Sequence, residues 1–305
     1  MDGHDLDLVT LRSADTRLDI APAIGGSIAR FCTTKAGREI DWFRPATREA
    51  LASRDPLGMA CFPLVPFSNR IRDRAFRFMD REIRLSHPFT HAEHGHGWLT
   101  PWNLVERTED RLALEFARPA DDWPFAYRAR QAFHLAPDAL AVTLRVENVG
   151  ASPMPLGIGL HPYFVRTPQS RLTARTDRIW ETDAEILPTS LVEAGPARDL
   201  GRGLSVDTIA LDNCYTGWTG SAAIDWPERR MRMTMTATGQ LSFLVVYTPA
   251  GEDFFCAEPV SNCTDAFNLA AQGRADTGMR VLPPGETMHT TITFTARPAP
   301  QPIGE

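Results

Sequence analysis

The stretch FAYRARQAFHLAPDALAVTLRV, residues 125–146, contains the pattern that decides the fold. Apolar and polar side chains alternate along it in two runs, which Ala136, Pro137 and Asp138 separate. Because successive side chains of a strand point to opposite faces of a sheet, this alternation is typical of half-buried β-strands. A short break with Pro and Asp between two such runs predicts an antiparallel hairpin.

The same pattern recurs elsewhere in the chain. Residues 75–85 (AFRFMDREIRL) break at Met-Asp-Arg, and residues 230–247 (RMRMTMTATGQLSFLVVY) break at Thr-Gly, so we expect a hairpin from each. Residues 288–295 (MHTTITFT) predict a β-branched closing strand. Amphipathic helical spacing is not sustained for more than about ten residues. The sequence therefore predicts a mainly β, antiparallel fold.

The domain organisation follows from length and composition. The chain has 305 residues with 24 Pro and 21 Gly, which indicates many turns. All-β proteins of more than about 200 residues often form one domain, and no repeat or low-complexity block divides this chain. We expect one domain over residues 1–296 and a loose Pro-rich tail over residues 297–305.

Charge and cysteine content restrict the partners and the compartment. The net charge is -6 and no basic run occurs, so we expect no nucleic-acid partner. No signal-peptide pattern is present, and no apolar run approaches the roughly 18 residues that cross a bilayer. The five cysteines are scattered and form no C-x-x-C pair, which favours a reducing cytoplasm. We expect a small-molecule partner, no membrane association, and either a monomer or a homodimer.

Residues 91–98, HAEHGHGW, hold three of the eight histidines, and three interpretations are open. On an extended strand His94 and His96 would share a face and could bind zinc or iron with Glu93. One imidazole could instead serve as an acid/base group in a pocket. The third interpretation is a polar, Gly-rich loop that is simply exposed.

Four polar residues stand in strongly apolar surroundings elsewhere. They are Arg70 in CFPLVPFSNRIRD, His161 in GLHPYF, Asp212 in LDNCYTGW and Glu258 in FFCAEPVSNCTDAFN. Each alone is more often a hydrogen-bonded structural residue than a functional one. Together they predict a pocket with charged groups and aromatic walls. Such a pocket suits a sugar, because aromatic faces pack on the apolar side of a pyranose while polar groups bind its hydroxyls.

The segments PFSNRI, HGHGW, GLHPYF, LDNCYTGW, AEPVSNCTDAFN and VLPPGET occur in this order, and together they resemble the aldose 1-epimerases, or mutarotases. The resemblance covers residues 8–296. It implies a large antiparallel β-sandwich of the galactose mutarotase type, a sugar substrate, and chemistry with no metal or organic cofactor.

The resemblance also implies roles for particular residues. Glu258 matches the general base and His161 the general acid, and the two exchange protons with the anomeric hydroxyl and the ring oxygen. His94 matches a second active-site histidine, while Arg70 and Asp212 match residues that anchor the substrate. We expect three further residues to line the pocket: Asn69, His96 and Trp98. His91 is then a bystander, and a shared metal is not needed.

Departures from the galactose mutarotases leave the sugar open. Leu160 precedes His161, and Val165 and Arg166 follow the Tyr-Phe pair, where that branch has other residues. A related group acts on hexose 6-phosphates, and the alternating Arg residues of NRIRDRAF could grip a phosphate or could simply form a solvated face. A sugar-binding or regulatory protein without catalysis is the remaining alternative.

Overall fold

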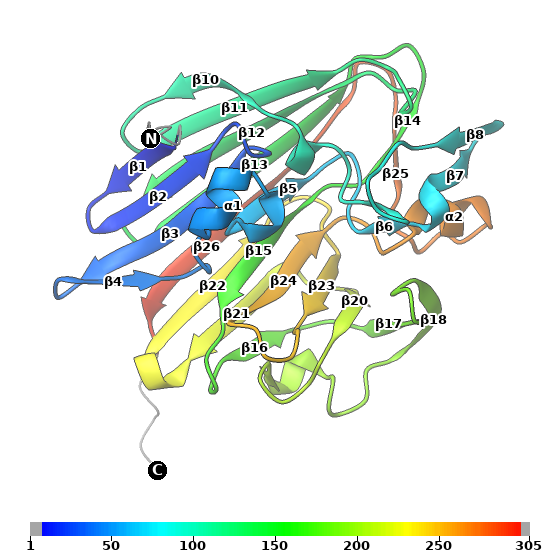
Figure 1. The fold of residues 1–305 in the computed structure, drawn as a ribbon. Helices are drawn as coiled ribbons and strands as arrows, with labels where there is room; N and C mark the ends of the chain where they lie inside the picture. Colours follow the sequence, from blue (N-terminus) through cyan, green and yellow to red (C-terminus); the bar gives the residue numbers. More distant parts are fainter. Residues whose placement is uncertain (1–7, 300–305) are drawn as a thin grey trace.

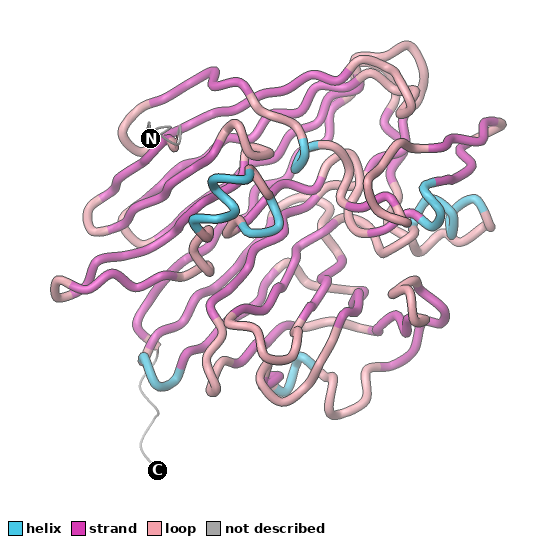
Figure 2. The backbone as a smooth tube through the Cα atoms, in the orientation of Figure 1, coloured by secondary structure: helices cyan, strands magenta, loops and turns pink. Residues whose placement is uncertain are grey.

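Antiparallel strands form two large sheets in the computed structural model, which describes residues 8–299 (Figure 1). Strands extend through most of the molecule, and the helices between them are short (Figure 2). The prediction of a mainly β, antiparallel sandwich is confirmed.

The larger sheet contains eleven strands. Its order is β1 (Val9–Ser13), β2 (Thr16–Ala21), β3 (Ser27–Lys35), β5 (Cys61–Leu64), β15 (Gly159–Val165), β24 (Phe254–Val260), β23 (Phe243–Tyr247), β20 (Asp212–Thr216), β17 (Arg178–Thr182) and β18 (Pro188–Glu193), with β4 (Arg38–Asp41) paired to β3.

The smaller of the two large sheets contains nine strands. Its order is β10 (Asn103–Arg107), β11 (Arg111–Arg118), β12 (Tyr127–Ala136), β13 (Ala139–Asn148), β26 (Thr287–Pro298), β22 (Met231–Ala237), β21 (Ser221–Trp226), β16 (Arg171–Ala174) and β19 (Leu204–Ser205).

Short elements connect these sheets. Three two-stranded sheets pair β14 (Met154–Leu156) with β25 (Arg280–Leu282), β6 (Arg70–Ile71) with β9 (Ala92–Glu93), and β7 (Ala75–Phe78) with β8 (Arg81–Arg84). The helices are α1 (Arg48–Ser53), α2 (Ala266–Ala271) and the 3-10 turns η1 (Pro56–Gly58), η2 (Arg72–Arg74), η3 (Gly97–Leu99), η4 (Leu200–Arg202) and η5 (Pro227–Arg229). Within residues 8–299, no helix is long and apolar enough to cross a membrane.

The predicted hairpin of residues 125–146 forms as β12 and β13, which pair from Tyr127 with Asn148 to Ala136 with Ala139. Alternate residues of β12 are buried, as the sequence pattern indicates. These apolar side chains face the larger sheet, and one hydrophobic core joins residues of both sheets. For example, Phe294 of β26 lies 5.0 Å from Phe43, measured between ring centroids. The hairpin of β7 and β8 and the closing strand β26 are also confirmed.

Two expectations about strands are wrong. Residues 230–247 do contain two strands, but β22 pairs within the nine-stranded sheet and β23 within the eleven-stranded one, so they form no hairpin. Strand β26 continues to Pro298, where it pairs with Met231, so the predicted loose tail begins too early. Residues 300–305 of that tail lie outside the described part. The single-domain organisation stays a prediction.

Candidate active site

Neighbouring strands β15 and β24 of the larger sheet are buried on both faces. One face packs on the smaller sheet, because Phe164 contacts Phe294 with ring centroids 6.2 Å apart. The opposite face carries His161 and Glu258. The register that pairs Tyr163 with Cys256 places these two residues directly across from each other. We call this the outer face of the larger sheet.

The His161 and Glu258 side chains are in contact. His161 Nε2 lies 3.3 Å from Glu258 Oε1, and the side chains are only 8% and 3% exposed. The other polar atom of each group, His161 Nδ1 and Glu258 Oε2, is buried and has no hydrogen-bond partner among the described residues. Because buried polar atoms are nearly always paired, this pair has unused capacity for a polar ligand.

Burial also controls the pKa values of the pair. It lowers the pKa of His161 to about 3, because an imidazolium loses solvation in the protein interior. It raises the pKa of Glu258 well above the usual value, and the nearby charge of Asp212 raises it further. The positive charge of Arg70 acts in the opposite direction and favours the carboxylate.

Aromatic rings fix the plane of the His161 imidazole. The Phe62 ring of β5 lies 4.5 Å from the His161 ring between centroids, and the Tyr163 ring lies 4.7 Å from it with an interplanar angle of 21°. The Arg44 guanidinium covers Tyr163 at 4.6 Å from its ring centroid. The His161 imidazole is therefore packed against two aromatic rings, which restrict its rotation.

His94 lies beside His161, with the two ring centroids 5.1 Å apart. The backbone N–H of Asn69 donates to His94 Nδ1 over 3.3 Å, while the N–H of His94 donates to the Asn69 carbonyl over 3.0 Å. Burial lowers the pKa of His94 to about 3, so its imidazole is neutral at pH 7. Since Nδ1 accepts a hydrogen bond, the proton of the neutral ring is on Nε2, which can donate.

Arg70 and Asp212 form the charged border of the site. Arg70 NH1 lies 4.0 Å from Asp212 Oδ2, although the two residues are far apart in sequence. Arg70 Nε donates to Glu93 Oε1 over 2.9 Å, which orients the guanidinium. Burial raises the pKa of Asp212 to about 6, and Arg70 partly offsets the effect. Glu93 thus belongs to the site, although the sequence suggested it only as a possible metal ligand. The one sequence signal for a role of Glu93 was its position between His91 and His94.

Two of the residues predicted to line the pocket, Asn69 and Trp98, lie next to the site and contact its other residues. The Asn69 side-chain oxygen accepts from the backbone N–H of Arg70 over 2.8 Å, which shapes the turn before β6. Trp98 is 1% exposed and stacks on Phe62 at 5.2 Å, so it lies beneath the site and not on its surface. Its Nε1–H donates to the carbonyl of Glu93 over 3.1 Å.

His96, which we expected to line the pocket, lies apart from the other predicted site residues. Its Nδ1 is 3.0 Å from the hydroxyl of Tyr127 on β12, and its ring packs on Trp123 and Phe67. Burial lowers the pKa of His96 to about 3. His96 therefore connects the loop to the smaller sheet.

The three imidazoles of HAEHGHGW do not converge on one point. Asp73 donates its backbone N–H to His91 Nδ1 over 3.0 Å, and His91 Nε2 lies 3.7 Å from Glu185 Oε1. The potential metal ligands among the described residues are different ones: single atoms of His161, Cys256 and Glu258 all lie within 4.8 Å of one another. Burial raises the pKa of the Cys256 thiol, which opposes the thiolate that metals bind. All five cysteines are free and buried.

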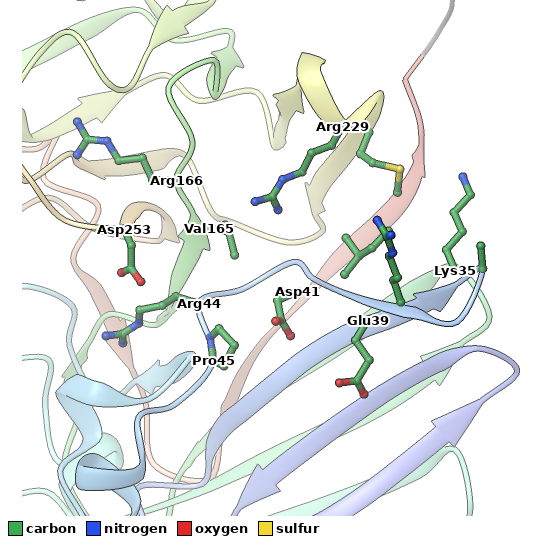
Figure 3. A pocket seen from close by; sticks show the side chains of 13 residues that line it. Lys35, Glu39, Asp41, Arg44, Pro45, Val165, Arg166, Arg229 and Asp253 are labelled. Atoms are coloured by element: carbon green, nitrogen blue, oxygen red, sulfur yellow. The ribbon is translucent and has the colours of Figure 1, made fainter.

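Two cavities lie near the site. One, of about 620 Å³, borders Arg70 and Glu93. The other, of about 680 Å³, lies beyond the end of β15 and is shown in Figure 3. There the Arg229 side chain extends into the hollow, whereas Arg166 points away from it and donates to Asp207 over 3.1 Å. This second cavity contains none of the predicted site residues.

Comparison with known proteins places the chain in a family. The sequence profile described as aldose 1-epimerase matches residues 7–295. The uncharacterised protein YphB of Escherichia coli K12 is 32% identical over 300 residues, covering 95% of this chain and 98% of YphB. The crystal structure of an E. coli K12 protein described as a candidate aldose 1-epimerase superposes with a TM-score of 0.85 at 30% identity, covering 95% of this chain and 98% of that one. A galactose mutarotase-like protein from Clostridium acetobutylicum shares the fold, with a TM-score of 0.84 at 17% identity and 95% coverage of both chains. The chain therefore belongs to the aldose 1-epimerase family.

Proposed function

We propose that this protein interconverts the α and β anomers of a free aldose by opening and reclosing the sugar ring. The observation that carries the proposal is the buried contact of 3.3 Å between Glu258 and His161. Ring opening requires one group that removes the proton of the anomeric hydroxyl and a second that protonates the ring oxygen. A carboxyl and an imidazole on one face of a sheet can perform both steps in concert.

The two protonation states of the pair correspond to the two ends of ring opening. Before the ring opens, the proton that burial places on Glu258 has moved to His161, so that Glu258 is a carboxylate and His161 an imidazolium. Glu258 takes the proton of the anomeric hydroxyl, His161 gives a proton to the ring oxygen, and the bond from C1 to the ring oxygen breaks. An open-chain aldehyde then faces a neutral carboxyl and a neutral imidazole. Rotation about the C1–C2 bond and the reverse proton transfers give the other anomer.

Opposing electrostatic effects support this cycle. Burial favours the neutral form of the pair, because it raises the pKa of Glu258 and lowers the pKa of His161. Arg70 favours the charged form, because it lowers the pKa of Glu258. Burial is the larger effect, so the neutral pair is the resting form, and the charged pair forms by transfer of one proton between the two side chains.

The neighbouring polar groups have roles that fit the same reaction. His94 Nε2–H and Arg70 can donate to a sugar oxygen on which negative charge develops, and such preorganised donors are usually the largest electrostatic contribution. Asp212 can accept from sugar hydroxyls and so fix the position of the ring.

The alternatives have less support. A sugar-binding protein without catalysis would not need a buried acid/base pair with unpaired polar atoms, which lowers the stability of the fold. A hexose 6-phosphate would need unpaired cations beside the site. Of the alternating arginines, Arg70 contacts Glu93, and Arg72 lies 3.3 Å from Asp183.

The test is the replacement Glu258→Gln, which keeps the shape of the side chain and removes the base. We expect the rate of α to β interconversion of freshly dissolved aldoses, followed by polarimetry, to fall by about 10²–10⁴-fold. Glu228→Gln on exposed η5 is the matched control, and its rate should equal that of the unchanged protein. Near-normal activity in Glu258→Gln would show that Glu258 is not the base. If the unchanged protein binds an aldose but never accelerates its mutarotation, the binding-protein alternative is correct.

A further inference from the structure

We propose that the cavity beside Arg70 is a second sugar subsite, so that the preferred substrate is the reducing end of a neutral oligosaccharide. This inference rests on the proposed function, because the reducing-end aldose would occupy the site at Glu258 and His161. The next sugar residue would then lie in the cavity. The reaction is unchanged: protons move at the anomeric hydroxyl and the ring oxygen, and the glycosidic bond is not touched.

The cavity shares Arg70 and Glu93 with the border of the candidate active site. Its lining includes Arg70 and Glu93, and Arg70 also lies 4.0 Å from Asp212. A ligand group held at the border by Arg70 can therefore extend in either direction. The remaining lining comes from three separate segments: Leu57 of η1, residues 88–91, and residues 184–186 between β17 and β18.

The cavity is larger than one sugar requires. Its volume is about 620 Å³. At the roughly 30 Å³ that one water molecule takes in the liquid, the non-hydrogen atoms of a hexose need about 360 Å³. The cavity does not include the region of Glu258 and His161, where the first sugar would bind.

Phe89 provides an aromatic wall. It is 37% exposed, while its ring is stacked on buried Trp98 with centroids 6.2 Å apart and an interplanar angle of 28°. Trp98 in turn stacks on Phe62, which lies against His161. Phe89 is thus a rigidly backed aromatic face within a cavity lining, the type of surface on which the apolar side of a pyranose packs.

The lining also contains a strained residue. Ile186 lines the cavity with φ of 59°, a conformation that is unfavourable for a β-branched side chain. A tight turn holds it there, because Asp183 Oδ1 accepts from the backbone N–H groups of Glu185 and Leu187 over 2.9 and 3.0 Å. A glycine would avoid this strain. An apolar side chain kept at such a position is consistent with a contact surface, since strained residues cluster at functional sites.

The charges of the lining favour a neutral ligand. Arg70 is the only Lys or Arg of this lining, and it pairs with Glu93. Glu185 adds a second carboxylate, so the lining has no excess positive charge for a phosphate. Thr90, His91 and the two carboxylates offer hydrogen bonds of the kind that sugar hydroxyls make.

The test compares an aldose with reducing disaccharides that end in the same aldose, for example glucose with maltose, cellobiose and lactose. The aldose is chosen as the best monosaccharide substrate, and glucose 6-phosphate is a third probe. Rates of anomer exchange are measured by NMR, which resolves the α and β anomeric protons. We expect kcat/KM for at least one disaccharide to exceed that of the monosaccharide by roughly tenfold or more, as one stacking contact can provide.

Two variants report on the two apolar lining residues, Phe89 and Ile186. Phe89→Ala and Ile186→Gly should each lower kcat/KM for that disaccharide by roughly tenfold and change monosaccharide exchange less than about twofold. Phe89→Trp, which retains a ring, should keep the disaccharide preference. Leu104→Ala, at an exposed apolar residue of β10, is the control and should change neither rate.

The outcomes separate this inference from the proposed function. Equal kcat/KM for monosaccharide and disaccharides, or equal losses on both in Phe89→Ala and Ile186→Gly, would overturn the subsite and leave the epimerase activity intact. A preference for glucose 6-phosphate over both would also overturn it. If no aldose exchanges faster than in buffer, the proposed function fails and the subsite with it.

Discussion

Asp212 is the carboxylate whose ionisation changes within the working pH range. It is partly buried beside Arg70, and its pKa is raised to about 6. Its negative charge also raises the pKa of Glu258. In the proposed reaction Asp212 binds the sugar hydroxyls as a carboxylate, so kcat/KM falls as the pH drops through the pKa of Asp212.

We therefore expect Asp212→Asn to move the acid limb of kcat/KM to lower pH. The sign follows from the loss of the titrating group, because an amide at position 212 has no carboxylate to protonate near pH 6. The displacement should be about one pH unit, the usual size of such environmental effects. The measurement is kcat/KM for anomer exchange at pH values from about 4.5 to about 8, a range that includes the titration of these groups. Asp80→Asn, at an exposed turn residue, should leave the limb unchanged. An unmoved limb in Asp212→Asn would mean that another group controls it.

The candidate site was only partly predictable from single residues. His161 and Glu258 stood out because each is a polar residue within an apolar strand, and the resemblance to a family joined them. The ion pair of Arg70 with Glu93 was not predictable from the sequence. The strands that bring the two residues together, β6 and β9, have two residues each and are too short to show a period. The position of His96 was also not predictable: His94 and Gly95 both have positive φ, so the alternation of a strand does not apply.

At the scale of elements, the loop that carries His94 depends on one close backbone approach. Gly95 has φ of 73° and forms a bridge with Val65, and His96 and Gly97 both donate their backbone N–H to the Val65 carbonyl, over 2.8 and 3.0 Å. A Cβ on residue 95 would overlap that carbonyl. This contact holds the loop against the end of β5, beside the outer face.

Gly95→Ala should consequently lower both stability and activity. Positive φ alone costs about 1–3 kcal/mol for a non-glycine residue, and the overlap with backbone adds to it. We expect a fall in the free energy of unfolding of at least that size, measured by urea titration, and a loss of anomer exchange as His94 moves. Gly195→Ala is the matched control, since its Cβ would meet no atom within 4 Å. Equal stabilities of the two variants would contradict the assigned role of Gly95.

The strands themselves illustrate what periodicity can specify. Hairpins β12–β13 and β7–β8 were predictable because a tight turn forces adjacent strands to pair. Strands β22 and β23 show the same alternation, yet the segment between them crosses from one large sheet to the other. Alternation reports that a strand has one buried face. It does not report which sheet supplies the covering layer, because both sheets bury the same types of side chain.

At the scale of the whole molecule, a few polar contacts connect the two large sheets across an apolar core. Trp226 of β21 donates its Nε1–H to the carbonyl of Val165 on β15 over 2.8 Å. His96, anchored to the end of β5 through Val65, meets Tyr127 of β12 at 3.0 Å. The candidate site faces away from this interface, so the site and the contact between the sheets use different faces of the same strands. Histidines of one short motif accordingly serve both purposes, His94 at the site and His96 at the interface.

This division predicts how acid affects the fold. The pKa of His96 is lowered to about 3 in the folded protein, against about 6.5 in an unfolded chain. Between these values the unfolded state binds one proton more than the folded state. The contribution of His96 to the free energy of unfolding is therefore present above pH 6.5 and is lost as the pH falls.

His96→Phe keeps a ring but leaves the Tyr127 hydroxyl without this partner, which should lower the free energy of unfolding by about 1–3 kcal/mol at pH 7. Because the variant has no imidazole to protonate, the difference from the unchanged protein should narrow by about 2 kcal/mol at pH 5. Urea unfolding of both proteins at the two pH values measures this, with His289→Gln, at an exposed position, as the matched control. A difference for His96→Phe that does not depend on pH would show that His96 is not held neutral at the interface.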